Sequence, residues 1–81
     1  MKRYISVRVV NGSGRPVPHE RVALYVSQSV GAGMLPEKYT TTEGLAEFEP
    51  DIDEFARLSV YVNGIEKVKA VPIQAKFTVV I

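Results

Sequence analysis

Apolar and polar residues alternate along most of this 81-residue chain, with the period of two that is typical of half-buried β-strands. Shorter strands are predicted at residues 37–42, 45–49 and 65–70, and no helical period of useful length interrupts the pattern. The sequence therefore predicts an all-β fold of about seven strands. The inward-facing residues of the four clearest strands are Ile5, Val7 and Val9; Val22, Leu24 and Val26; Leu58, Val60 and Val62; and Phe77, Val79 and Ile81.

A turn rich in glycine and proline, NGSGRPVP, separates the first two predicted strands. Gly12 and Gly14 permit turn dihedrals, while Pro16 and Pro18 fix φ and remove two N–H donors that no β-ladder could satisfy there. Such a corner suits a chain that leaves one sheet and crosses to a second. We therefore expect one domain, residues 1–81, built as a two-layer β-sandwich.

A second turn, Asn63-Gly64, is the strongest short hairpin signal in the chain. A two-residue loop there would pair Val60 with Lys67 and direct lysines toward the core. We therefore expect a three-residue loop with Gly64 in a left-handed conformation and a bulge beside it. The inward-facing positions of this hairpin would then be Leu58, Val60, Val68 and Ala70.

The charge is nearly balanced, at +1, which argues against a nucleic-acid binder that works by bulk electrostatics. Six of the nine acidic residues lie in residues 43–54, whereas the start of the chain is basic. There is no cysteine, so disulfides and thiol chemistry are excluded. We expect no membrane partner, because no apolar segment resembles a signal peptide or a transmembrane helix. A complete chain of this kind would be cytoplasmic; an excised domain leaves the location open.

The stretch VRVVNGSGRPVPHERVALYV followed by TTTEGLAEFEP resembles the carboxypeptidase regulatory-like and transthyretin-like (prealbumin-like) domains. In these domains a first strand ends in a Gly-Pro crossover, and a Thr-containing turn with Gly leads into a strand carrying Phe. The resemblance covers residues 5–62, and bacterial Ig-like repeats share much of it. This chain departs from the family at residues 19–21, where small residues are usual, and at residues 55–57, which replace a Gly-x-Tyr.

The resemblance implies an Ig-like or prealbumin-like sandwich with a definite strand order. The second predicted strand would lie between the third and the fifth, and the sixth would lie beyond the fifth. The first, fourth and seventh would form the other layer.

Catalysis is not indicated by any motif. His19 is the only histidine, and no serine or cysteine nucleophile accompanies it. Hydroxyisourate hydrolases of the transthyretin-like family carry several histidines and a C-terminal Tyr-Arg-Gly-Ser, whereas this chain ends in TVVI. We therefore expect neither an enzyme nor a cofactor.

The acidic turn Asp51, Asp53 and Glu54 offers oxygen ligands of the kind that calcium prefers. Calcium takes about six to eight oxygens, and three carboxylates are too few. The spacing also lacks the glycine and distant glutamate of an EF-hand loop. We expect a solvated turn and no metal site.

Tyr25 and Tyr61 lie out of phase with their core neighbours, so they are expected to share the solvent face of adjacent strands, with Tyr39 beside them. Such a platform can stack sugars or anchor a protein partner. Cross-strand tyrosines also stabilise ordinary exposed sheets. The sequence alone favours this second interpretation.

The segment QSVGAGMLP, residues 28–36, has no alternation and is predicted to be a loop. Its apolar residues Val30, Met34 and Leu35 could contact a partner, since loops on a rigid sandwich often bind. Alternatively Met34 and Leu35 fold back and plug the end of the sandwich, which the sequence favours.

The final strand, KFTVVI, is predicted to lie at a sheet edge, where strand addition would give a homodimer or peptide recognition. We therefore expect a non-catalytic interaction or structural module. It would bind a protein partner or a second copy through edge strands, the 28–36 loop or the Tyr25/Tyr61 face. The alternative is a carbohydrate-binding domain that uses the same tyrosines.

Overall fold

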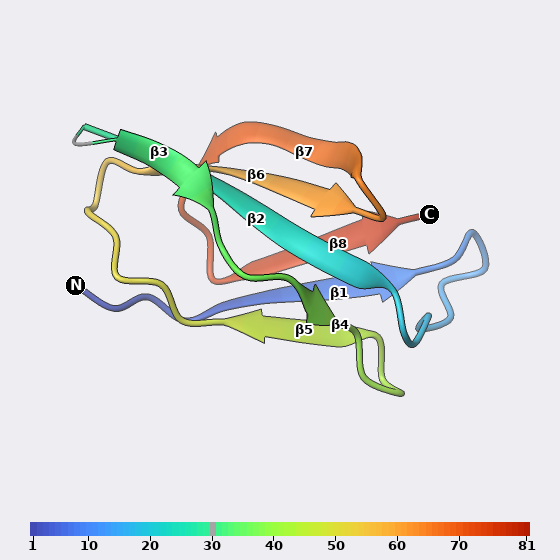
Figure 1. Ribbon diagram of the computed structural model, residues 1–81. Coiled ribbons are helices and arrows are strands. Elements are labelled where there is room, and N and C mark those ends of the chain that lie inside the picture. Colours follow the sequence, from blue (N-terminus) through green and yellow to red (C-terminus); the bar gives the residue numbers. More distant parts are fainter. Residues whose placement is uncertain (30) are drawn as a thin grey trace.

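The computed structural model describes residues 1–29 and 31–81, in which eight β-strands form two sheets (Figure 1). The described part of the chain contains no helix. The predicted all-β fold is therefore confirmed. The strands are β1 (Ile5–Val10), β2 (Arg21–Gln28), β3 (Gly31–Met34), β4 (Lys38–Tyr39), β5 (Leu45–Phe48), β6 (Arg57–Val62), β7 (Ile65–Pro72) and β8 (Lys76–Val80).

The two sheets form the predicted two-layer sandwich. The larger sheet has the order β3-β2-β6-β7. The short strand β4 pairs with β2 on the same side as β3, but at the opposite end of β2. The smaller has the order β5-β1-β8, in which β1 and β8 run parallel. This arrangement agrees with the strand order that the family resemblance implied, if β4 is taken as the third predicted strand.

One strand was not predicted. The segment Gly31–Met34, expected to be part of a loop, pairs with β2 as β3, while the strand expected at residues 37–42 is reduced to β4. Glycines occupy two of the four β3 positions and hide any alternation of side chains. Backbone pairing with β2 keeps the segment extended, and the pattern of apolar residues within one segment does not reveal such pairing.

The core lies between the sheets and consists of the predicted inward faces. It contains Ile5, Val7, Val9, Val22, Leu24, Val26, Leu58, Val60, Val62, Phe77 and Val79, joined by Ala46, Phe48, Ile52 and Ala56. Ile81 is an exception, with 41% of its surface exposed, because β8 ends one residue before it. Full burial of one such Val, Leu or Ile side chain contributes about 1.5–3 kcal/mol, so these residues dominate the favourable side of folding.

The crossover between β1 and β2 is held by two polar side chains. The Asn11 side-chain oxygen accepts hydrogen bonds from the N–H groups of Ser13 and Arg15, at 2.9 and 3.0 Å. At the other end, the Thr40 hydroxyl donates to the Val17 carbonyl at 2.8 Å and accepts from the Glu20 N–H at 2.9 Å. Backbone groups that no ladder reaches are thereby satisfied.

The β6–β7 hairpin corrects the predicted three-residue loop. Val62 pairs with Ile65, so the loop has only Asn63 and Gly64, whose φ angles of 53° and 81° fit a type I′ turn. The expected bulge lies further along β7. It places Val68 opposite Val60, on the inward face as predicted, and keeps lysine out of the core.

A second irregularity in β7 changes the other predicted pair. Leu58 lies opposite Val71, and Ala70 is exposed with φ 42°. The Ala70 N–H donates to the Ser59 hydroxyl at 2.9 Å. The side-chain hydrogen bond and the left-handed backbone turn Ala70 outward, so its predicted inward position is wrong.

Candidate functional site

The strand β3 is an edge of the larger sheet, and its outer backbone groups face away from β2. The Leu35 N–H donates to the Leu24 carbonyl at 2.9 Å. Because hydrogen-bonded pairs recur at every second residue of an antiparallel ladder, Gly33 and Gly31 also bond toward β2. The N–H and C=O groups of Ala32 and Met34 therefore point outward from the sheet edge.

Successive residues of β3 face opposite sides of the sheet. Met34 lies opposite Tyr25 and therefore on the outer face, whereas Gly33 lies opposite the buried Val26 and faces the space between the layers. Gly31 shares the inward orientation of Gly33. The two inward positions of β3 thus have no side chain.

A groove of about 380 Å³ occupies this space, between β3 and the segment Pro50–Ile52. It exists because the glycines leave the side of the sandwich unfilled. Its apolar walls are contributed by both layers, and Gln28 and Asp51 are the polar side chains that line it. The lining residues are Val26, Gln28, Gly31, Ala32, Gly33, Met34, Leu35, Pro50, Asp51 and Ile52.

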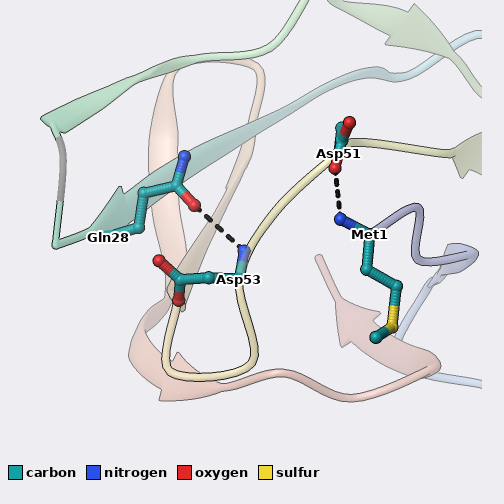
Figure 2. Close-up of polar contacts among 4 residues, drawn as sticks. All are labelled: Met1, Gln28, Asp51 and Asp53. Atoms are coloured by element: carbon teal, nitrogen blue, oxygen red, sulfur yellow. Dashed lines mark hydrogen bonds and ion pairs between the residues drawn. The ribbon is translucent and has the colours of Figure 1, made fainter.

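Polar contacts fix the acidic segment beside the end of β2, as Figure 2 shows. The Gln28 side-chain oxygen accepts the Asp53 N–H at 3.1 Å, and the Asp51 carboxylate accepts from the Met1 amino group at 2.5 Å. This hydrogen bond and the positive charge of the amino group lower the pKa of Asp51. The Asp53 carboxylate accepts from the Ser29 hydroxyl at 3.3 Å. The Asp53 carboxylate therefore lies near the Gly31 end of the groove, whereas the Asp51 carboxylate is paired with the Met1 amino group.

The tyrosine face lies on the outer side of the same sheet. Tyr25 is opposite Ser59, and Tyr61 is opposite Ala23. Ser59 and Ala23 are only 6% and 5% exposed although they point away from the core, because each has a tyrosine ring beside it. The two tyrosines, diagonal neighbours, are themselves half-buried. Part of each tyrosine ring therefore packs on the sheet.

The Tyr61 hydroxyl donates to the Glu66 carboxylate at 3.3 Å. Loss of solvent around the ring and the negative charge of Glu66 raise the pKa of Tyr61. Tyr39 is exposed and lies opposite Arg21, at the far end of β2. The structure thus places Tyr25 beside Met34 on one side and diagonal to Tyr61 on the other, and it places Tyr39 opposite Arg21, near the start of β2.

The predicted plug is confirmed for one of its two residues. Leu35 is partly buried against the core, whereas Met34 is 54% exposed beside Tyr25. Val30 lies outside the described residues. Sequence reasoning missed Gly31 and Gly33, although their spacing of two, which places both on one face of a strand, was a usable signal.

The remaining edges differ in protection. Along β7, Glu66, Lys67 and Lys69 and two register irregularities discourage pairing with another chain. The strand β8 is an edge, as predicted, and Lys76 is its only charged residue. The strand β5 has four residues and contains Glu47.

His19, the only histidine of the chain, is exposed in the crossover. Its φ is 60°, and its backbone N–H donates to the Thr40 carbonyl. Within residues 1–29 and 31–81, no cluster of three or more His, Cys, Asp or Glu side chains could hold a metal ion. In the same residues, no helix is long and apolar enough to cross a membrane.

No protein-family model, curated protein or solved structure matches the chain. The likeness to carboxypeptidase regulatory-like and transthyretin-like domains thus stays a prediction, which depends on the residues quoted above.

Proposed function

We propose that this chain is a non-catalytic binding module that takes an extended segment of a partner protein as an additional strand on β3. This proposal depends on one observation: the backbone groups of Ala32 and Met34 point outward, at an edge with which no other strand of residues 1–29 and 31–81 pairs. An extended peptide can satisfy such groups with its own backbone, and side-chain contacts on either face then supply specificity.

The composition of β3 supports this use. Edge strands that must remain free usually carry lysine, proline or a bulge. The sequence of β3, Gly-Ala-Gly-Met, has neither charge nor proline, and its pairing with β2 runs without a break in register. The contrast with the charged and irregular β7, on the opposite edge of the same sheet, favours β3 as the pairing edge.

Side-chain contacts are available on both faces of β3. Met34 and Tyr25 offer an adaptable apolar surface on the outer face, where methionine and aromatic side chains suit protein recognition. The groove beside Gly33 offers space on the inner face. A strand seated on β3 would meet both features at once.

Self-association is the second candidate, and β8 favours it. This edge exposes Val80 and Ile81 and carries one charge, so two copies could pair through it. Light scattering over a range of concentrations separates the two uses: a mass that stays at 9.0 kDa excludes the dimer. A carbohydrate ligand on the tyrosine face would instead give saturable binding on a glycan array that Tyr61→Ala abolishes.

The direct test is selection of binders from a random peptide library displayed on phage, followed by calorimetry with the selected peptides. Ala32→Pro removes an outward N–H and leaves the bonds of Gly31, Gly33 and Leu35 to β2, and proline is tolerated at strand edges. We expect this variant to keep its melting temperature and lose binding.

A matched control uses the peptide. For an antiparallel peptide, N-methylation at a residue that pairs with Ala32 or Met34 should also prevent binding, whereas N-methylation at the next residue should not. For a parallel peptide the two positions exchange roles, because parallel hydrogen bonds run to the residues that flank the paired one. Failure to select any peptide, or full affinity in a folded Ala32→Pro variant, would contradict strand addition at β3.

A further inference from the structure

We infer that the segment bound by β3 carries a branched aliphatic residue opposite Gly33 and a lysine or arginine opposite Gly31. This inference rests on the proposed function and specifies its ligand: an extended basic-apolar peptide. Three properties of the groove beside β3 lead to it.

The first property is direction. A strand added to β3 exchanges hydrogen bonds with Ala32 and Met34, whose backbone groups point outward. The residue between these two contacts pairs with Gly33. Because paired residues of neighbouring strands project to the same face, its side chain points inward, toward the groove. This holds for parallel and antiparallel addition alike.

The second property is space bounded by apolar atoms. A Cβ atom built on Gly33 meets no atom within 4 Å, so nothing in the described chain fills this position. The groove of about 380 Å³ is bounded by Val26, Leu35, Pro50 and Ile52. A valine, leucine or isoleucine side chain would exchange water for these apolar walls, which is favourable roughly in proportion to the area covered.

The third property is charge, which distinguishes the two ends of the groove. Gln28 pairs with Gly31, and its side-chain oxygen accepts the Asp53 N–H, so Asp53 lies near the Gly31 end. Asp51 also lines the groove, but its carboxylate already accepts from the Met1 amino group. Residues 47–56 contain five acidic side chains and no lysine or arginine. A cationic side chain opposite Gly31, two positions from the aliphatic one, is therefore complementary.

The test uses synthetic seven-residue peptides with threonine at the outward positions and valine and lysine at neighbouring inward positions. Both orders of valine and lysine are made, since the added strand can run in either direction. Replacing valine by alanine should weaken binding about 10-fold or more. Replacing lysine by glutamine should weaken it by a smaller factor, and that difference should vanish near 1 M salt.

A protein variant supplies a matched control. Gly33→Val places a side chain of the protein itself in the groove, at a position without positive φ or a close neighbour, so the fold should be kept. We expect this variant to bind the valine and alanine peptides equally. Gly12→Val, which meets no atom within 4 Å in the crossover, should retain the preference for valine.

The outcomes separate this inference from the proposed function. If peptides shift the Ala32 and Met34 amide resonances but valine and alanine bind equally to the wild type, strand addition stands and the inference is wrong. A valine preference that persists in Gly33→Val also overturns it. If Gly33→Val does not fold, Asp53→Asn must abolish the preference for lysine. If no peptide binds, both proposals fail.

Discussion

Thr40 allows a quantitative test of how the crossover is held against the larger sheet. This residue is only 2% exposed, and its hydroxyl makes two hydrogen bonds, to the Val17 carbonyl and from the Glu20 N–H. Thr40→Val replaces the hydroxyl by a methyl group of similar size, so packing is preserved and the two bonds are lost. The backbone bonds from His19 and to Glu20 do not depend on the side chain.

The expected loss follows from these contacts. Each hydrogen bond contributes about 1 kcal/mol net, and leaving its partner unsatisfied near the core adds a desolvation cost. We therefore expect Thr40→Val to lower the free energy of unfolding by about 2–3 kcal/mol. For a domain of this size the melting temperature should fall by about 10–20 °C.

Urea denaturation followed by circular dichroism measures this loss directly. Two variants serve as controls: Thr40→Ser keeps the hydroxyl, and Thr42→Val changes an exposed threonine of the same turn. Both should unfold at higher urea concentrations than Thr40→Val. A Thr40→Val variant within about 0.5 kcal/mol of the wild type, the range typical of surface substitutions, would refute the assigned role of this hydroxyl.

Three further predictions concern the turn before β5 and the outer face of the larger sheet. A Cβ on Gly44, which has φ +75°, would lie 2.6 Å from the Val9 carbonyl oxygen, so Gly44→Ala should lower the melting temperature strongly and Gly12→Ala should not; equal melting curves would contradict this contact. The pKa of Tyr61 is raised by desolvation and by Glu66, so its stabilising contribution is present below the unfolded pKa and is lost as pH rises through the folded pKa. Glu66→Gln should therefore move part of the phenolate absorbance titration to lower pH, and an unchanged curve would exclude the contact. Met34→Ser should weaken peptide binding while leaving thermal unfolding unchanged, because Met34 is 54% exposed; a large loss of stability would place Met34 in the core.

The sequence predicted the core and the layers because both depend on alternation, which is visible in single strands. Val7, Leu24 and Val60 are buried as expected, since each lies in a run whose period is two. The crossover was predictable for a related reason: glycine and proline restrict the backbone locally.

The edge strand and the hairpin could not be predicted in this way. The glycines of β3 contribute no hydrophobic signal, and only the partner strand β2 determines that Gly31–Met34 is extended. In the hairpin, the two-residue turn at Asn63-Gly64 would by itself place Lys67 opposite Val60. A bulge in β7 adds one residue and places Val68 there. A local rule for the turn could not reveal where the extra residue would be placed.

The candidate site was predicted in part for the same reasons. The sequence placed Tyr25 and Tyr61 on one face, because their phase is opposite to that of the core. It did not place Met34 beside Tyr25, since that contact requires β3. The groove depends on Gly33 and Ile52, which lie far apart in the sequence and meet only across the two layers.

Amide hydrogen exchange measured by NMR, with and without a saturating selected peptide, tests the central claim most directly. Strand addition predicts that the Ala32 and Met34 amides, which point away from β2, become strongly protected in the complex. The Gly33 amide, already bonded to β2, should change much less. New protection confined to Thr78 and Val80 of β8, or to no edge at all, would contradict the proposal that β3 receives the partner.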